Sequence, residues 1–144
     1  MDENHTDDNP VIATQADLEA LWRRLMEPLG FTRTSVWMML ISADGVPLRQ
    51  LVEFDEAHDP PGAEERRQFA GLLGELAESV DGRRVAFLRT RPGSGGLTRK
   101  DRRWAQALYA VARLAGLSCE VVHVANDVRL VPVPMDELAL RRSA

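Results

Sequence analysis

The sequence predicts an α/β domain in which a mixed central sheet carries helices on its faces, a three-layer-like sandwich. Two observations predict this class. Apolar runs of strand length alternate with amphipathic stretches of helix length, in the order α-β-β-α-β-α-β-β. The chain of 144 residues, 44% of them hydrophobic, also has the size and composition of one globular domain.

The chain begins with an acidic segment that we expect to be a disordered tail. Residues 1–13 are polar, contain Pro10 and show no hydrophobic periodicity, so the single folded domain is assigned to residues 14–140. A helix is expected over 15–29, with Thr14 as its N-cap. Its inner face consists of apolar residues spaced three or four apart, namely Leu18, Leu21, Trp22, Leu25 and Leu29.

Two antiparallel strands and a second helix are expected next. The run 35–42 is almost continuously apolar, which is typical of a strand covered on both faces. Asp44 and Gly45 indicate a hairpin turn into a second strand over 46–54. A helix over 63–79 follows, and its expected inner face consists of Phe69, Leu72, Leu73 and Leu76.

The second half of the chain predicts a strand–helix–strand unit and a final strand. A strand over 84–90 leads through a glycine-rich loop into a helix over 99–115. A strand over 118–125 and a last strand over 128–133 follow. Because proline has no N–H to donate, Pro132 and Pro134 are expected to place the last strand at an edge of the sheet or to end it early. The helix is expected to bury Trp104, Leu108, Val111 and Ala115.

Composition limits where this protein works. The only cysteine is Cys119, so no internal disulfide can form. No run approaches the ~20 apolar residues of a membrane helix. Residues 1–8 lack the basic start and the apolar core of a signal peptide. These features predict a cytoplasmic protein without a membrane partner.

Charge is unevenly distributed along a chain whose net charge is −4. Residues 1–20 contain six acidic residues and no basic one, whereas residues 83–103 contain eight basic residues and one acid, Asp101. Such asymmetry predicts either a solvated basic face or an anion-binding surface. Lys100 is the only lysine among 18 basic residues, which is typical of a GC-rich bacterial genome as well as of bidentate anion contacts.

Metal and nucleophile motifs are not found in the sequence. His5, His58 and His123 are scattered, and no cysteine–histidine spacing typical of zinc occurs. We expect His123, in an apolar strand, to be half-buried and hydrogen-bonded. Cys119 is interpreted as a small apolar side chain. The tryptophans Trp22, Trp37 and Trp104 are interpreted as core residues.

The glycine-rich loop and the start of the following helix carry a recognisable pattern. The chain reads Arg89-Thr90-Arg91-Pro92-Gly93-Ser94, Gly95-Gly96-Leu97 and Thr98-Arg99-Lys100-Asp101. This segment resembles the JAB/MPN metalloprotease-like fold, particularly its RadC-like branch, in which a strand ends in His-x-His-Pro-Ser-Gly and a helix starts with Pro-Ser-x-x-Asp. Pro92 matches, Thr98 stands where the family has serine, and Asp101 stands at the ligand aspartate. In that family two histidines and the aspartate hold zinc, and an upstream glutamate is the general base.

The departures from this family concern the metal ligands. Arg89 and Arg91 stand where the family has histidines, the loop is one residue shorter, and no glutamate can be assigned, although Glu53 lies upstream. Arginine is always charged and offers no lone pair to a metal. The resemblance therefore implies a JAB/MPN-like fold in a degenerate pseudoenzyme that has no metal and no other cofactor. Thr98 and Asp101 then form a helix cap or a vestige of the old site.

The sequence thus favours a non-catalytic interaction or regulatory module that binds an acidic protein or a small anion through residues 89–103. The residues assigned to ligand binding are Arg89, Arg91, Ser94, Arg99, Lys100 and Arg103. One alternative is a metal-independent enzyme in which Arg89 and Arg91 hold an anionic substrate and Asp101 or Glu53 acts as acid or base. Another is association with nucleic acid, which the acidic net charge and the lack of stacking aromatics disfavour.

Overall fold

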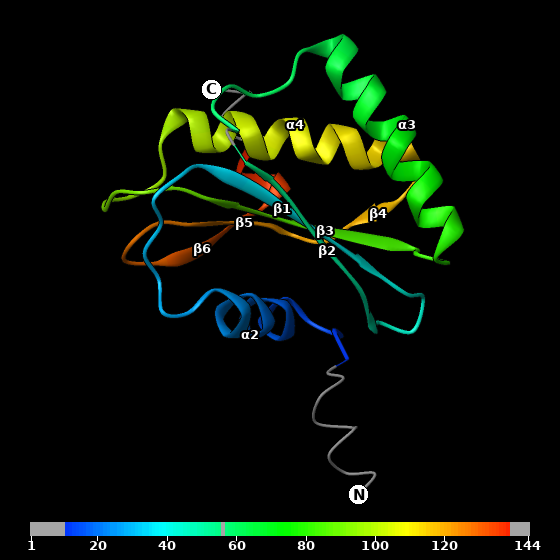
Figure 1. Ribbon diagram of the computed structural model, residues 1–144, viewed down its shortest axis with the longest axis horizontal. Helices are drawn as coiled ribbons and strands as arrows, with labels where there is room; N and C mark the ends of the chain where they lie inside the picture. Colours follow the sequence, from blue (N-terminus) through cyan, green and yellow to red (C-terminus); the bar gives the residue numbers. More distant parts are fainter. Residues whose placement is uncertain (1–10, 56, 139–144) are drawn as a thin grey trace, which may run out of the picture.

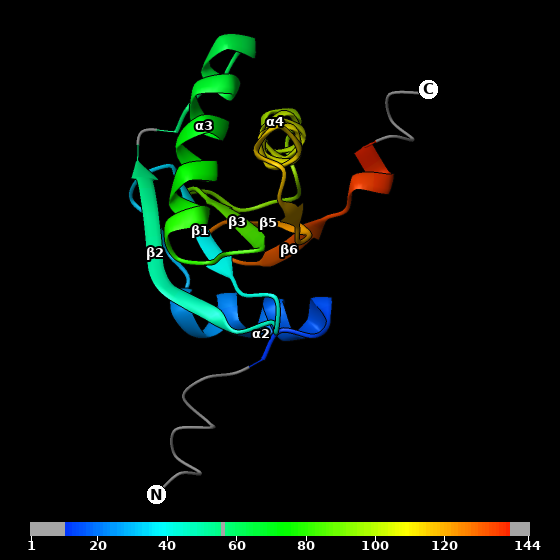
Figure 2. The same ribbon diagram turned by 90° about the vertical axis from the view of Figure 1, so that its right-hand side faces the viewer.

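In the part of the chain that the structure describes, a six-stranded mixed sheet is covered by helices on both of its faces (Figure 1, Figure 2). The structure is a computed structural model and describes residues 11–55 and 57–138. The strand order is β2-β1-β3-β5-β6, and the short β4 also pairs with β3. The strands are β1 (Ser35–Ile41), β2 (Pro47–Asp55), β3 (Arg84–Thr90), β4 (Ser118–Cys119), β5 (Val122–Ala125) and β6 (Leu130–Val133). The predicted α/β class with a mixed sheet is confirmed.

One face of the sheet is covered by α2 (Gln15–Met26), whose buried residues include Leu18 and Trp22. Thr14 and Asp17 form a capping box at its start. The helix ends three residues earlier than predicted, because the residue before Pro28 is extended and cannot continue the helix. Leu25, predicted to face the core, is exposed.

The N-terminal segment and the β1–β2 turn hold each other in place. Gly45 has φ +87°, a conformation that favours glycine, and its carbonyl accepts a hydrogen bond from Ile12 N at 2.7 Å. A Cβ at this position would lie 2.8 Å from the Ile12 carbonyl oxygen. Ile12 itself is buried, so this residue of the predicted tail packs against the core. Residues 1–10 of that tail lie outside the described residues.

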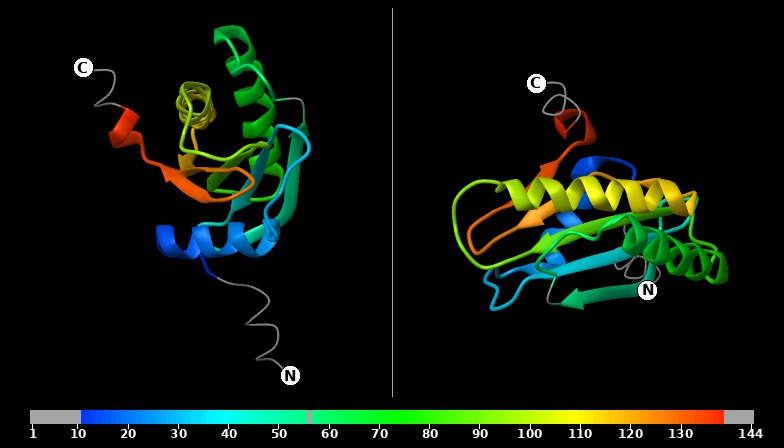
Figure 3. Two further views of the ribbon diagram at one scale, coloured as in Figure 1. Left: turned by 90° about the vertical axis from the view of Figure 1, so that its left-hand side faces the viewer. Right: turned by 90° about the horizontal axis from the view of Figure 1, so that it is seen from above.

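The other face of the sheet is covered by α3 (Ala63–Ser79) and α4 (Arg99–Ala115), which pack side by side (Figure 3). Both helices have the predicted bounds. Phe69 of α3 contacts Phe54 and Phe87 edge to face, with ring centroids 5.3 and 6.1 Å apart. The expectation for Leu72 is wrong, since its side chain is 68% exposed. The buried stripe of α3 is Ala70, Leu73 and Ala77, and Leu72 points away from it.

The predicted strand over 118–125 is divided into β4 and β5. Both pieces pair with β3 in parallel, as a strand–helix–strand unit requires. Between them Glu120 N donates to Val85 O at 2.9 Å. The last strand begins at Leu130 rather than at residue 128, because the Asn126 side chain accepts from the N–H groups of Val128 and Arg129 in a turn.

None of the helices in the described part of the chain is long and apolar enough to cross a bilayer.

Candidate functional site

The glycine-rich loop ends in a capped helix. Thr98 Oγ1 accepts from Asp101 N at 3.1 Å, and Asp101 Oδ2 accepts from Thr98 N at 2.9 Å, so the two residues form a capping box. The negative charge of Asp101, in the first turn of α4, interacts favourably with the positive end of the helix dipole. This cap turns the Asp101 carboxylate back towards the end of β3.

Asp101 is the centre of an ion cluster with the two arginines of β3 and its following loop. Arg89 Nε donates to Asp101 Oδ1 at 3.1 Å. Arg91 binds the same carboxylate with two donors, from Nε to Oδ1 at 2.8 Å and from Nη2 to Oδ2 at 2.7 Å. The exposed fractions of the three side chains are 3% for Arg89, 13% for Arg91 and 0% for Asp101. We call these three residues the Arg–Asp–Arg cluster.

Hydrogen bonds keep the Asp101 carboxylate ionised inside the protein. Burial alone would raise its pKa, but hydrogen bonds from Arg91, the Thr98 N–H and Arg89 outweigh burial and lower the pKa to about 2. For Arg89, burial is the largest effect and lowers the pKa, and Asp101 partly opposes it. Two positive charges around one negative charge leave the cluster with a net positive charge.

The guanidinium groups of the cluster make further contacts within the protein. Arg89 Nη1 donates to Ala57 O at 2.7 Å, and its Cζ lies 5.6 Å from the centre of the Trp104 ring. Arg91 donates to the carbonyls of Pro92 and Gly96, each at 3.3 Å. Both arginines were predicted to bind a ligand, and the structure places their donors mainly on internal acceptors.

A second carboxylate holds the far side of the glycine-rich loop. Asp127 Oδ2 accepts from Gly93 N, and its Oδ1 accepts from Phe31 N, both at 2.8 Å. These backbone donors lower the pKa of Asp127. Asn126 donates to Gly95 O at 2.9 Å. Asn126 and Asp127 together join the glycine-rich loop to the end of β5.

The other residues predicted to bind a ligand lie on the surface. Ser94 is exposed in the loop, and Arg99 and Lys100 are exposed on the first turn of α4. Lys100 Nζ lies 3.3 Å from Asp59 Oδ1. Arg103, one turn further along α4, is exposed and lines a broad groove described below.

Glu53 lies on the opposite face of the sheet from the Arg–Asp–Arg cluster. It is paired in register with Trp37, and its Oε2 accepts from Ser35 Oγ at 2.7 Å and lies 3.2 Å from Arg33 Nη2. Side chains alternate along strands, and Trp37 packs in the core cluster under α2, whereas Val85 and Phe87 lead to Arg89 on the α4 side. Glu53 therefore does not share a pocket with Asp101.

His123 and the predicted core tryptophans lie away from the cluster. His123 is fully buried rather than half-buried, and its Nδ1 lies 3.0 Å from Val121 O. Burial lowers its pKa, so the ring is neutral at pH 7. Trp22 and Trp104 are buried, and Trp37 is partly buried and packs against the core cluster under α2. Among the described residues no group of three or more metal-binding side chains occurs.

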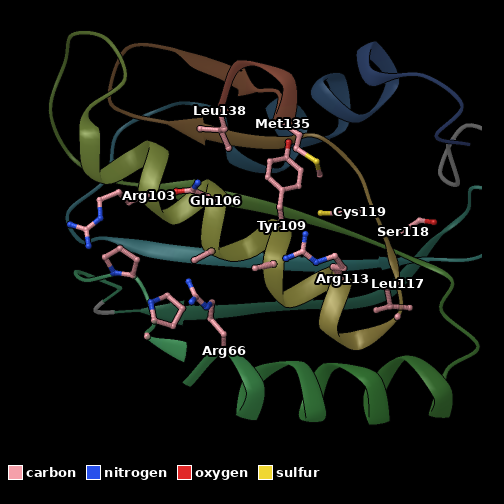
Figure 4. A pocket seen from close by; sticks show the side chains of 16 residues that line it. Arg66, Arg103, Gln106, Tyr109, Arg113, Leu117, Ser118, Cys119, Met135 and Leu138 are labelled. Atoms are coloured by element: carbon pink, nitrogen blue, oxygen red, sulfur yellow. The ribbon is translucent and has the colours of Figure 1, made fainter. Parts of the chain in front are cut away.

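A groove of about 1170 Å³ runs over α4 on the helical face of the molecule (Figure 4). Its floor is formed by α4, where Ala107 and Ala110 have small side chains and Gln106 and Tyr109 have larger ones. One wall comes from the start of α3 and the loop before it. The other wall comes from β4 and the segment 135–138. The apolar residues of this second wall are Leu117, Cys119, Met135 and Leu138.

Three arginines line this groove, which we call the basic groove: Arg66 from α3, and Arg103 and Arg113 from α4. Within the described part of the chain, no carboxylate lies within 4.0 Å of their guanidinium groups, and no carboxylate lines the groove. Arg103 was predicted as a binding residue. Arg66 and Arg113 were missed, because the predicted helices carried no indication that α3 and α4 lie side by side.

Cys119 in the wall and Tyr109 of α4, which both line the groove, are poor nucleophiles. Burial, with a smaller contribution from Glu120, raises the pKa of Cys119 to about 12. Burial also raises the pKa of Tyr109 to about 12, although the Val122 N–H that its hydroxyl accepts opposes this effect. The Tyr109 hydroxyl in turn donates to Val133 O at 2.8 Å. Both groups are therefore protonated at neutral pH.

No protein-family model matches the sequence, and no curated protein matches it.

Proposed function

We propose that this chain is a non-catalytic interaction module that binds an acidic protein partner through the basic groove and the adjoining first turn of α4. The observation that carries the proposal is the set of three groove arginines, Arg66, Arg103 and Arg113, whose side chains have no described carboxylate in ion-pair distance. Arg99 extends this positive surface towards the glycine-rich loop. Exposed like charges on one surface favour an oppositely charged partner.

The Arg–Asp–Arg cluster has a different role in this proposal. An external anion at Arg89 or Arg91 would have to replace hydrogen bonds to Asp101 that are 2.7 to 3.1 Å long. The cluster therefore holds β3, the loop and α4 together. Binding is assigned to the exposed arginines of α4 rather than to the arginines beside the loop. The pKa values of Cys119 and Tyr109 support a role without nucleophilic chemistry.

We also propose that the fold is a degenerate JAB/MPN-like fold. In support, the residues at positions 89, 91 and 101 converge, as the two histidines and the aspartate of that family would. The arginines do not fit a zinc ion, because a guanidinium is a cation without a lone pair. No step of the proposed function involves a metal.

A histidine-restoring variant tests this fold assignment. Arg89→His with Arg91→His leaves Asp101 without cationic partners and places two imidazoles beside it. If the fold is JAB/MPN-like, the double variant will bind about one zinc per chain, and zinc will raise its melting temperature. Adding Asp101→Asn should abolish that rise. A folded double variant that zinc does not stabilise would contradict the assignment.

Binding of poly-L-glutamate tests the proposed function. We expect salt-sensitive binding by the wild type, measured by calorimetry at low ionic strength. Arg103→Glu with Arg113→Glu should weaken it at least tenfold. The matched control is Arg24→Glu with Arg129→Glu, which makes the same charge change at two exposed arginines away from the groove. Equal weakening in both pairs would show a general charge effect and overturn the proposal.

A nucleic acid is the competing class of partner, and the same two variants distinguish it. Duplex DNA and single-stranded RNA are titrated under the same conditions. If either binds more tightly than poly-L-glutamate and loses affinity only in the Arg103 and Arg113 variant, the partner is a nucleic acid and the proposal of an acidic protein falls.

A further inference from the structure

We infer that the basic groove accepts an amphipathic α-helix of its partner, with acidic residues at both ends of the contact and apolar residues between them. This inference rests on the proposed function and adds the form of the partner. Its basis is the arrangement of the groove along α4, where charged and apolar features occupy separate positions (Figure 4).

The charges lie at the two ends of the groove floor. Arg103 and Arg113 are ten residues apart on α4, which corresponds to about 15 Å along a helix axis. Arg66 lies on the α3 wall of the same groove. A partner that meets both α4 arginines must therefore carry two negative charges about three helical turns apart, and one helix lying along α4 can supply them.

Between the charges the groove is shaped for close approach. Ala107 and Ala110 have small side chains, so a second helix can approach α4 closely there. The apolar wall beside them includes Met135, which is 55% exposed, and Leu117. Apolar residues spaced three or four apart on the partner would cover this wall. A purely acidic, unstructured peptide would leave it in water.

A strand is a poorer fit than a helix at this site. The sheet edge nearest the groove is β4, which has only two residues, Ser118 and Cys119. Two residues supply too few backbone donors and acceptors for strand addition. Most of the groove surface instead comes from side chains of α4 and its two walls.

Two segments of this chain outside the described residues do not match the groove. Residues 139–144 contain Arg141 and Arg142 and no Asp or Glu side chain, so their side chains would repel the groove arginines. Residues 1–10 are acidic but almost without apolar residues, and the described chain starts on the α2 side of the sheet, opposite the groove (Figure 2). A separate acidic, amphipathic partner matches both the charge and the apolar wall.

Selection from a display library of random 16-residue peptides tests the inference. The library is selected on the wild-type chain and counter-selected on the Arg103→Glu, Arg113→Glu variant. Enriched peptides should carry acids about ten positions apart and apolar residues at helical spacing. A synthetic copy should become helical on binding, as read by circular dichroism, and bind at least tenfold more tightly than a scrambled peptide of the same composition.

Two single variants on the chain test the geometry of the contact. Ala110→Trp fills the floor of the groove and should weaken the selected peptide at least tenfold. Met135→Ser removes apolar surface at an exposed position and should weaken the same peptide about fivefold. No effect from either variant in a chain with wild-type circular dichroism would overturn the inference.

The outcomes also separate this inference from the proposed function. Enriched acidic peptides without helical spacing would overturn the helix and leave the acidic partner in place. Enriched peptides with alternating apolar residues would indicate a strand and likewise overturn the helix. No enrichment of acidic sequences, together with no binding of poly-L-glutamate, would overturn both.

Discussion

Arg89 shows that burial can change the role of a charged side chain. In the sequence it belongs to a run of eight basic residues within positions 83–103, a pattern that favours an exposed anion-binding face. In the structure its side chain is 3% exposed and is bound to Asp101 and to a backbone carbonyl. A buried charge is tolerated only when it is paired and hydrogen-bonded, and Asp101 meets that requirement for two arginines at once.

The first prediction compares the two arginines of the cluster. Arg89→Ala should lower the free energy of unfolding by about 3–5 kcal/mol, because it removes a buried partner of Asp101. Arg91→Ala should cost about 1–3 kcal/mol, since Arg91 is more exposed and Arg89 remains. Urea unfolding at pH 7 measures both, with Arg24→Ala as the control. A smaller cost for Arg89→Ala than for Arg91→Ala would contradict the burial of Arg89.

The second prediction concerns pH. The pKa of Asp101 is about 2 in the folded chain, below its ordinary value of 3.8, so its stabilising contribution is complete above pH 4 and is lost as pH falls towards 2. The contribution is about 2 kcal/mol by linkage. The difference in unfolding free energy between wild type and Asp101→Asn should therefore shrink by about that amount between pH 5 and pH 2. A constant difference over this range would show that the Asp101 pKa is not lowered.

The helix α4 joins the core to the proposed binding surface. Its inner face buries residues such as Leu108 and Val111, its first turn holds Asp101, and its outer face lines the basic groove. Gly116 ends it at φ +76°, where glycine is favoured. A disturbance of the packing of α4 should therefore change both stability and binding.

The third prediction tests the packing of this element. Trp104 is buried, donates from Nε1 to His58 O at 3.3 Å and lies under the Arg89 guanidinium. Trp104→Ala should cost about 3–5 kcal/mol of stability. Denaturant unfolding followed by circular dichroism measures it, and Gln106→Ala, exposed on the same helix, is the control. An unchanged midpoint for Trp104→Ala would contradict the placement of the ring.

On the scale of the whole molecule, one sheet carries two core clusters. The cluster under α2 includes Trp22 and Leu88, and the cluster under α3 and α4 includes Phe87 and Leu108. Neighbouring residues of β3 thus point into different cores. The shared strand should couple the two layers, so that they unfold together.

The fourth prediction follows from this coupling. Leu18→Ala removes a fully buried side chain of α2 and should cost about 2–5 kcal/mol. Because the layers share β3, the slowest-exchanging amides of both β3 and α4 should lose protection by the same free energy, as measured by native-state hydrogen exchange. Unchanged protection in α4 would mean that the α2 layer unfolds by itself.

Local patterns in the sequence were sufficient for most of the fold. Apolar periodicity predicted the bounds of α3, β3 and α4, and Asp44-Gly45 predicted the β1–β2 turn. These signals depend on neighbours along the chain. They failed at Leu72 and Leu25, where helical spacing was right but the direction of the core was set by the packing of the whole helix.

The sequence predicted less of the candidate site than of the helices and strands. By itself the sequence determined that positions 83–103 are basic and that Thr98 and Asp101 have the spacing of a helix cap. Only the tertiary structure decided which charged side chains are paired inside the protein and which remain at the surface. The cap directs Asp101 back onto Arg89 and Arg91, whereas the packing of α3 beside α4 brings Arg66 to the groove of Arg103 and Arg113. Charge can be counted along a chain, but pairing and burial depend on distances between residues far apart in sequence.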